Sequence, residues 1–153
     1  LAGRGQRHSV SLPGGSLLLI DESYNASPMA MRAAFAVLRD AVPRAGGRRI
    51  AILGDMLELG GDAPALHEGL AGPIEAAGID LVITCGTLME SLHRALPAAR
   101  RGAHAANSAA LVPQVAAALR AGDVVTVKGS LGSKMKPVVE AILALGRAGR
   151  GGR

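Results

Sequence analysis

Aromatic side chains are nearly absent from this chain of 153 residues, since Tyr24 and Phe35 are the only two. A core built without them must be aliphatic, and hydrophobic residues make up 49% of the sequence. Proteins that bind single-stranded nucleic acid or RNA on a sheet usually stack bases on aromatic rings. The scarcity of aromatics therefore argues against that class of protein, and we expect no nucleic-acid partner.

Cysteine and long apolar runs are also scarce. Cys85 is the only cysteine, which excludes a disulfide within the chain and favours a reducing compartment. It follows Val82-Ile83-Thr84, the end of a predicted buried strand, so we interpret it as a packing thiol rather than a nucleophile. No apolar run approaches the roughly 18 residues that span a membrane, and the run at 17–20 ends in two acidic residues, unlike a secretory signal. We expect a soluble, cytoplasmic protein without a membrane span.

The net charge of +5 suggests nucleic-acid binding at first, but its distribution argues against that function. Residues 9–146 carry 12 basic and 12 acidic side chains, so the excess lies at the two ends, in Arg4, Arg7, Arg147, Arg150 and Arg153. The chain also starts at Leu1 without an initiator methionine. We therefore predict a fragment of a longer protein, with a linker remnant at 1–8, one globular domain at 9–146 and a disordered basic tail at 147–153.

Short apolar runs alternate with helical periodicity along the chain, which predicts an α/β fold. Near-continuous apolar strands, typical of a parallel sheet buried on both faces, are predicted at 16–20, 49–53, 81–84 and 124–127, with a weaker one at 103–105. Residues 8–12 alternate instead and precede Pro13-Gly14-Gly15, which predicts an antiparallel edge strand and a tight turn. The pattern predicts a Rossmann-like, doubly wound, mostly parallel sheet of about six strands, with helices on both faces.

Five helices are predicted between these strands. The first starts at the N-cap Ser27 and Pro28 and extends to Val42; the second starts at Asp62 and ends at Gly78, with a kink or split at Gly72-Pro73. Leucine and valine spacing predicts two more, over 88–96 and 111–119, and the last begins near Ser133.

Three polar loops follow the predicted strands, at 21–28, 54–60 and 128–134. Ligands of open α/β sheets bind beyond the carboxyl ends of the strands, so these loops are the candidate site. The first loop offers carboxylates and an amide that could bind a nucleotide, or that could only cap the following helix. The second offers Asp55 and Glu58, which could meet an ammonium group or a metal-bound phosphate, or could only belong to an ordinary solvated turn. The third places Lys128, Ser130 and glycine N–H groups before a helix, which suits an anion.

Several common site signatures are missing. The chain contains no Walker A loop, no G-x-G-x-x-G after the first strand and no G-x-S-x-G. Its histidines, His8, His67, His93 and His104, are scattered and give no zinc spacing. For His67 we expect a surface or helix-capping role rather than a catalytic one.

The three loops together resemble the C-terminal domain of the Mur ligase family, over about residues 3–145. The carrying runs are L-I-D-E-S-Y-N-A-S-P at 19–28 with Met31 and Arg32, I-L-G-D-M-L-E-L-G at 52–60 with His67 downstream, and V-K-G-S at 127–130. The G-D-M-L-E-L-G run is similar to the branch that joins D-alanyl-D-alanine to UDP-N-acetylmuramoyl-tripeptide in peptidoglycan synthesis.

The resemblance implies an ATP-dependent amide ligase that proceeds through an acyl phosphate, in which this domain is one of three. The N-terminal and central domains would be its partners within the same protein. The phosphate-binding loop and the Mg²⁺ ligands of such enzymes lie in the central domain, so the resemblance implies that this chain alone is inactive and holds no catalytic residue or metal ligand.

The resemblance also implies roles for individual residues. Glu22 corresponds to the acid that contacts ribose, within a nucleotide-binding run that includes Ser23, Tyr24 and Asn25. Asp55, Glu58, Lys128 and Ser130 correspond to the loops facing the amino substrate and the reacting phosphate. Two positions depart from the family: Glu22 is usually aspartate, and Leu131 stands where arginine is usual, which removes an anion contact.

Two alternatives remain open from the sequence. A folylpolyglutamate synthetase domain would share the fold, although the G-D-M-L-E-L-G run argues against it. A non-enzymatic α/β module that binds nucleic acid through its basic tails would belong to a different class.

Overall fold

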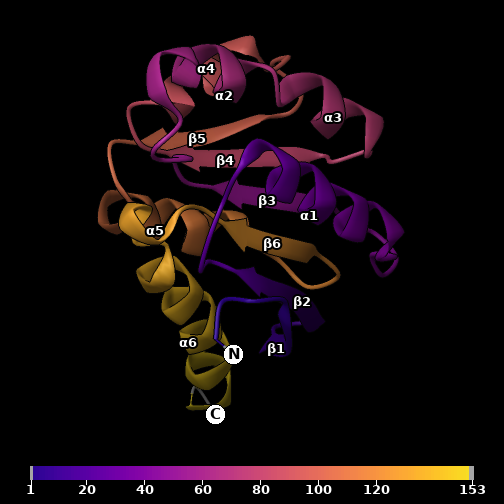
Figure 1. Cartoon of the computed structure of the whole chain (residues 1–153). Coiled ribbons are helices and arrows are strands. Elements are labelled where there is room, and N and C mark those ends of the chain that lie inside the picture. Colours follow the sequence, from indigo (N-terminus) through magenta and orange to yellow (C-terminus); the bar gives the residue numbers. More distant parts are fainter. Residues whose placement is uncertain (1, 152–153) are drawn as a thin grey trace.

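The protein forms a six-stranded sheet with the order β1-β2-β6-β3-β4-β5, in a computed structural model that describes residues 2–151. The order runs from the bottom to the top of Figure 1. Strand β1 pairs antiparallel with β2, and all other neighbours are parallel, as the sequence predicts. The strands are β1 Gln6–Leu12, β2 Gly15–Glu22, β3 Arg49–Leu53, β4 Leu81–Cys85, β5 Arg101–Ala105 and β6 Val124–Lys128.

Helices cover both faces because the chain reverses its direction of travel across the sheet. From β2 through β3 and β4 to β5 it moves one way, and right-handed crossovers place the intervening helices on one face. It then returns to β6, so the last two helices lie on the other face. The first group is α1 Pro28–Asp40, α2 Ala63–Glu68, α3 Ala71–Ala76 and α4 Met89–Ala95; the second is α5 Ser108–Ala118 and α6 Lys136–Gly151.

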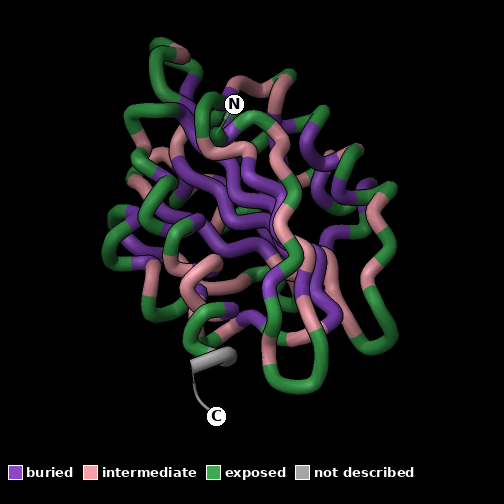
Figure 2. Tube along the Cα trace, turned by 90° about the horizontal axis from the view of Figure 1, so that it is seen from below, coloured by how far each residue is buried: buried purple, intermediate pink, exposed green. Residues whose placement is uncertain are grey.

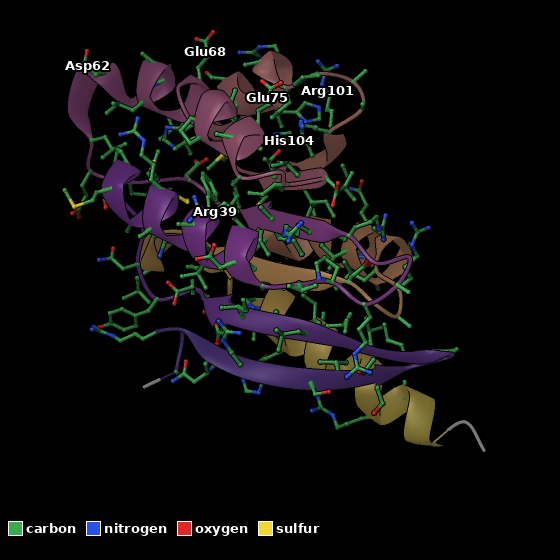
Figure 3. The ribbon with its side chains drawn as sticks, turned by 90° about the vertical axis from the view of Figure 1, so that its right-hand side faces the viewer. Arg39, Asp62, Glu68, Glu75, Arg101 and His104 are labelled. Atoms are coloured by element: carbon green, nitrogen blue, oxygen red, sulfur yellow. The ribbon has the colours of Figure 1, made fainter. Side chains whose placement is uncertain are left out.

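The core is aliphatic and divided by the sheet into two clusters. Along β6, Val125 and Val127 pack under α5 and α6, whereas Val124 packs on the α1 side. Figure 2 shows the central strands as the buried part of the chain, with exposed segments around them. On the α1 side the polar groups face outward: Figure 3 shows Asp62, Glu68 and Glu75 on the outer side of the layer, away from the sheet. Among residues 2–151, no helix combines the length and apolar character that a membrane span requires.

Helix boundaries differ from prediction at prolines. The first helix ends at Asp40, and Val42, expected on its buried face, is 82% exposed. Val42 precedes Pro43, and a residue before proline is driven out of the helical region. The second predicted helix is split, but at Gly69 and Leu70 rather than at Gly72-Pro73. Pro73 falls in the first turn of α3, where its missing N–H removes no helical hydrogen bond.

Both ends contain more strand and helix than the sequence predicts over the described residues. Residues 6–8, expected in the linker, belong to β1, because β2 extends to Glu22 and supplies pairing partners for them. Helix α6 continues to Gly151 through most of the expected disordered tail, since extending an existing helix adds a hydrogen bond for each residue fixed. Leu1 of the expected linker and residues 152–153 of the expected tail lie outside the described part.

Candidate functional site

The strand order brings the three predicted loops to one edge of the sheet. They follow β2, β3 and β6, and β6 lies between the other two. Parallel strands end at the same edge, so residues more than 100 positions apart in sequence become neighbours. The loops therefore form one continuous structure, as the sequence predicts.

Lys128 joins the third loop to the first. Its side chain ends a buried central strand and is 6% exposed. The ammonium group donates to the carbonyl of Asn25 at 2.9 Å, and Nζ lies 3.4 Å from Oε2 of Glu22. A charge buried to this degree is stable only when it is paired and hydrogen-bonded. We conclude that Lys128 fixes the first loop and the position of Glu22, instead of extending freely into a binding site.

Ser130 joins the third loop to the second. Its hydroxyl accepts from the Leu57 N–H at 2.9 Å, and its own N–H donates to the Asp55 carbonyl at 3.1 Å. The backbones here are so close that a Cβ on Gly129 would lie 3.2 Å from the Cα of Gly54. Ser130 therefore shapes the loop pair.

His67 is a third connection. Of the two roles expected for it, surface or helix-capping, the surface position was wrong. The ring is fully buried and holds the second loop against α2. Nε2 accepts from the Met56 N–H at 2.9 Å, and Nδ1 lies 2.6 Å from the Ala63 carbonyl. These partners require the neutral tautomer with the proton on Nδ1. The Met56 N–H belongs to a loop, outside any helix or strand, so the buried His67 ring supplies its acceptor.

The two carboxylates of the second loop are placed differently. Asp55 accepts from the Met89 N–H at 2.9 Å and the Leu88 N–H at 3.3 Å, which anchors it to the start of α4. A side chain on Gly86 would collide with this carboxylate, so glycine is required there. Glu58 is exposed in the left-handed conformation, with φ of 64°, and makes no hydrogen bond or ion pair within the described residues.

In the first loop, two side chains set the shape and two remain available. Ser23 donates its hydroxyl to Asp21 at 2.6 Å, and the side-chain oxygen of Asn25 accepts from the N–H of Ala26 at 2.8 Å. Tyr24 is 41% exposed, with the Arg4 guanidinium 4.2 Å from its ring centre on one face. Glu22 remains partly exposed, and only Oε2 faces Lys128.

Cys85 is a packing thiol, as predicted. Its sulfur donates to Met135 Sδ at 3.5 Å inside the core. Burial, and secondarily the nearby Asp55 carboxylate, raises the pKa of the Cys85 thiol to about 12. The thiolate needed for nucleophilic attack is therefore not populated near neutral pH.

Sequence reasoning missed two groups of polar residues. His93 of α4 and His104 of β5 are brought together, with ring centres 5.1 Å apart, although they looked scattered in sequence. The loops after β4 and β5 place Thr87, Asn107 and Ser108 beside the second loop, around a cavity with Asp55. The Asn-Ser pair at a helix start was the available signal, but only the strand order shows what it faces. Within residues 2–151, no three His, Cys, Asp or Glu side chains form a group that could hold a metal ion.

Known proteins share both the sequence and the fold. The family model for the Mur ligase, glutamate ligase domain matches residues 3–131. The UDP-N-acetylmuramoyl-tripeptide--D-alanyl-D-alanine ligase of Escherichia coli (strain K12) is 37% identical over 127 residues, which cover 82% of this chain and 26% of that protein. The enzyme of the same name from Bacillus subtilis (strain 168) is 30% identical over 142 residues, covering 91% and 31%.

Two solved structures show the same fold at lower identity. The MurF ligase of Thermotoga maritima, in complex with ADP, has a TM-score of 0.75 at 23% identity, over 96% of this chain and 32% of that one. A MurF of Acinetobacter baumannii has a TM-score of 0.78 at 21% identity, over 94% and 31%. The chain thus spans about a quarter to a third of the length of these relatives. The extent of the family match shows that the chain belongs to the Mur ligase family.

Proposed function

We propose that the chain is the C-terminal domain of an ATP-dependent ligase that joins D-alanyl-D-alanine to UDP-N-acetylmuramoyl-tripeptide. The observation that carries the proposal is the continuous edge formed by the three loops, in which Lys128 and Ser130 connect the runs that resemble this branch. Relatives that carry this enzyme name match over most of the chain. The enzyme would work in the cytoplasm, and the N-terminal and central domains of the same protein would be the partners of this one.

In this proposal the first loop binds nucleotide. ATP supplies the phosphoryl group that activates a carboxylate. Glu22 suits the ribose, because Oε1 has no partner among the described residues and a carboxylate accepts hydrogen bonds from hydroxyls. Tyr24 offers its ring to the base, while Ser23 and Asn25 hold the loop in shape.

The second and third loops would face the amino substrate. Asp55 and the exposed Glu58 supply negative charge for an ammonium group. Ser130 holds these two loops in register, and Lys128 holds the third loop against the first. Residues 2–151 form no group of three His, Cys, Asp or Glu side chains that could hold a metal ion by themselves. We propose that the metal and the phosphates are held outside this chain, and that the chain alone does not turn over.

A chimera tests this function. The matched segment of the E. coli relative is replaced by this chain, and ADP release is measured with and without D-alanyl-D-alanine. We expect release that depends on the dipeptide, and none from the chain alone. Glu22→Gln is expected to raise the KM for ATP, whereas Glu68→Gln on the outer side of α2 is not. A chimera that folds but shows no dipeptide-dependent release would contradict the proposal.

A further inference from the structure

A polar cavity of about 310 Å³ lies beside the second loop, between the ends of β3, β4 and β5. This volume is at the lower end of the range for small-ligand sites. One wall is formed by Asp55, and the start of α5 at Asn107 and Ser108 forms another. Lys134 also lines it. The cavity thus has a carboxylate on one side and groups that favour an anion on the other.

The anion side has several hydrogen-bond donors without acceptors. Helix α5 has 11 residues, and its N-cap Asn107 accepts from the N–H of Ala110. The N–H groups of Ser108 and Ala109 precede the first intrahelical bond, and no acceptor for them lies within residues 2–151. Helix N-termini of this kind favour negative charge.

Ser108 is a separate indication of a ligand. The residue is 6% exposed, lines the cavity, and its hydroxyl makes no hydrogen bond with any described residue. The hydroxyl therefore has no partner within residues 2–151, and it can donate to or accept from a group bound in the cavity. A ligand in the cavity would supply the missing partner.

Lys134 adds a cation at the same place. It is exposed, with φ of 55°, and forms no ion pair within the described part of the chain. Lys128 and Ser130, by contrast, use their polar atoms to hold the loops together. Lys134 is therefore better placed than Lys128 to meet a ligand anion in this region.

We propose that this cavity binds the free carboxylate of the incoming dipeptide, and that it selects substrates with a charged C-terminus. The carboxylate would accept from the α5 N–H groups, the Ser108 hydroxyl and the Lys134 ammonium group. Asp55, on another wall, suits the ammonium end of the same zwitterion. The inference deepens the proposed function and depends on it for the identity of the dipeptide.

Binding to this chain tests the site directly. D-alanyl-D-alanine and its C-terminal amide, D-alanyl-D-alaninamide, are titrated separately into the ¹⁵N-labelled chain. We expect the free acid to shift the Ser108 and Ala109 amide signals and to bind about tenfold or more tightly than the amide, because hydrogen bonds to a charged group are the stronger ones. Equal affinity for acid and amide, or shifts confined to other parts of the chain, would overturn the proposal.

Two variants and a matched control localise the effect. Lys134→Asn removes the charge with a residue that tolerates positive φ, and Ser108→Ala removes the hydroxyl; both should reduce the preference for the free acid. Lys136→Asn makes the same charge change on a residue that is exposed at the start of α6 and does not line this cavity, and should leave the preference unchanged. If both lysine variants lose the preference equally, general charge and not this cavity is responsible, and the site is rejected.

The two proposals can fail separately. If the free acid binds as expected but the chimera releases no ADP in response to it, the carboxylate site stands and the ligase function does not. If the chimera is active and Lys134→Asn and Ser108→Ala leave its KM for D-alanyl-D-alanine unchanged, the ligase function stands and the carboxylate site is overturned. Lys134 and Lys136 share a second cavity with Ser23 and Tyr24 of the first loop, whereas Ser108 does not line it. The KM for ATP is therefore the internal control for Ser108→Ala, and Lys136→Asn is the control for Lys134→Asn.

Discussion

Replacing His67 by leucine should detach the second loop from α2. The ring is fully buried and satisfies the Met56 N–H and the Ala63 carbonyl. Leucine fills a similar space but offers neither group. A buried N–H left without an acceptor costs about 1–3 kcal/mol, and the lost bond to the carbonyl contributes about 1 kcal/mol. We therefore expect His67→Leu to lower the free energy of unfolding by about 2–4 kcal/mol.

Urea unfolding and amide hydrogen exchange check this estimate together. The Met56 amide should exchange slowly in the parent chain and much faster in His67→Leu, while amides of β3 such as Ile52 keep their protection relative to global unfolding. His8→Leu on the edge strand β1 is the control, with an expected change within about 0.5 kcal/mol. A loss below about 1 kcal/mol, with the Met56 amide still protected, would refute the assignment of His67 as the acceptor for the loop.

Three further predictions concern titratable side chains. Asp123 is 1% exposed and accepts four hydrogen bonds, three of them from Arg48. Asp123→Asn should therefore lower the free energy of unfolding in urea by about 2–4 kcal/mol, less than for a fully buried pair because Arg48 is partly exposed; a change near zero would contradict this. Cys85, with its pKa raised to about 12, should resist iodoacetamide at pH 8 until the chain is unfolded, and rapid labelling of the folded chain would show the thiol is accessible. Burial, and next the neighbouring His104, lowers the pKa of His93, so the unfolded chain binds the proton more readily. The free energy of unfolding of the parent chain, compared with that of His93→Gln, should therefore fall as the pH drops below about 6.5, the ordinary histidine pKa. If the two proteins lose stability in parallel over this pH range, the effect is excluded.

The fold was largely predictable because its signals are local. The strands are apolar runs bounded by turn residues, and the alternation at 8–12 distinguishes the edge strand from the buried ones. Errors in boundaries arose where a local rule was overlooked, as at Val42 before Pro43, or where tertiary contacts extended an element, as at residues 6–8.

The candidate site was predictable in position but not in the roles of its residues. Strand ends locate Lys128 and Ser130, yet residue type does not show whether an ammonium or hydroxyl group faces a ligand or a neighbouring loop. That depends on the strand order, which places Asn25 and Leu57 within hydrogen-bonding distance of them. The cavity at Ser108 was missed for the same reason, since α5 lies far from the second loop in sequence.

The position of β6 has a consequence for how the protein is made. This strand is the last of the sheet to leave the ribosome, yet it lies between β2 and β3 and carries Lys128 at its end. Until it inserts, β2 and β3 have no shared partner, and their edges are open to pairing with other chains. The first and second loops therefore acquire their final arrangement only when the segment at 124–130 is in place. Premature termination before this segment should release a chain that aggregates, rather than a smaller domain with a weakened site.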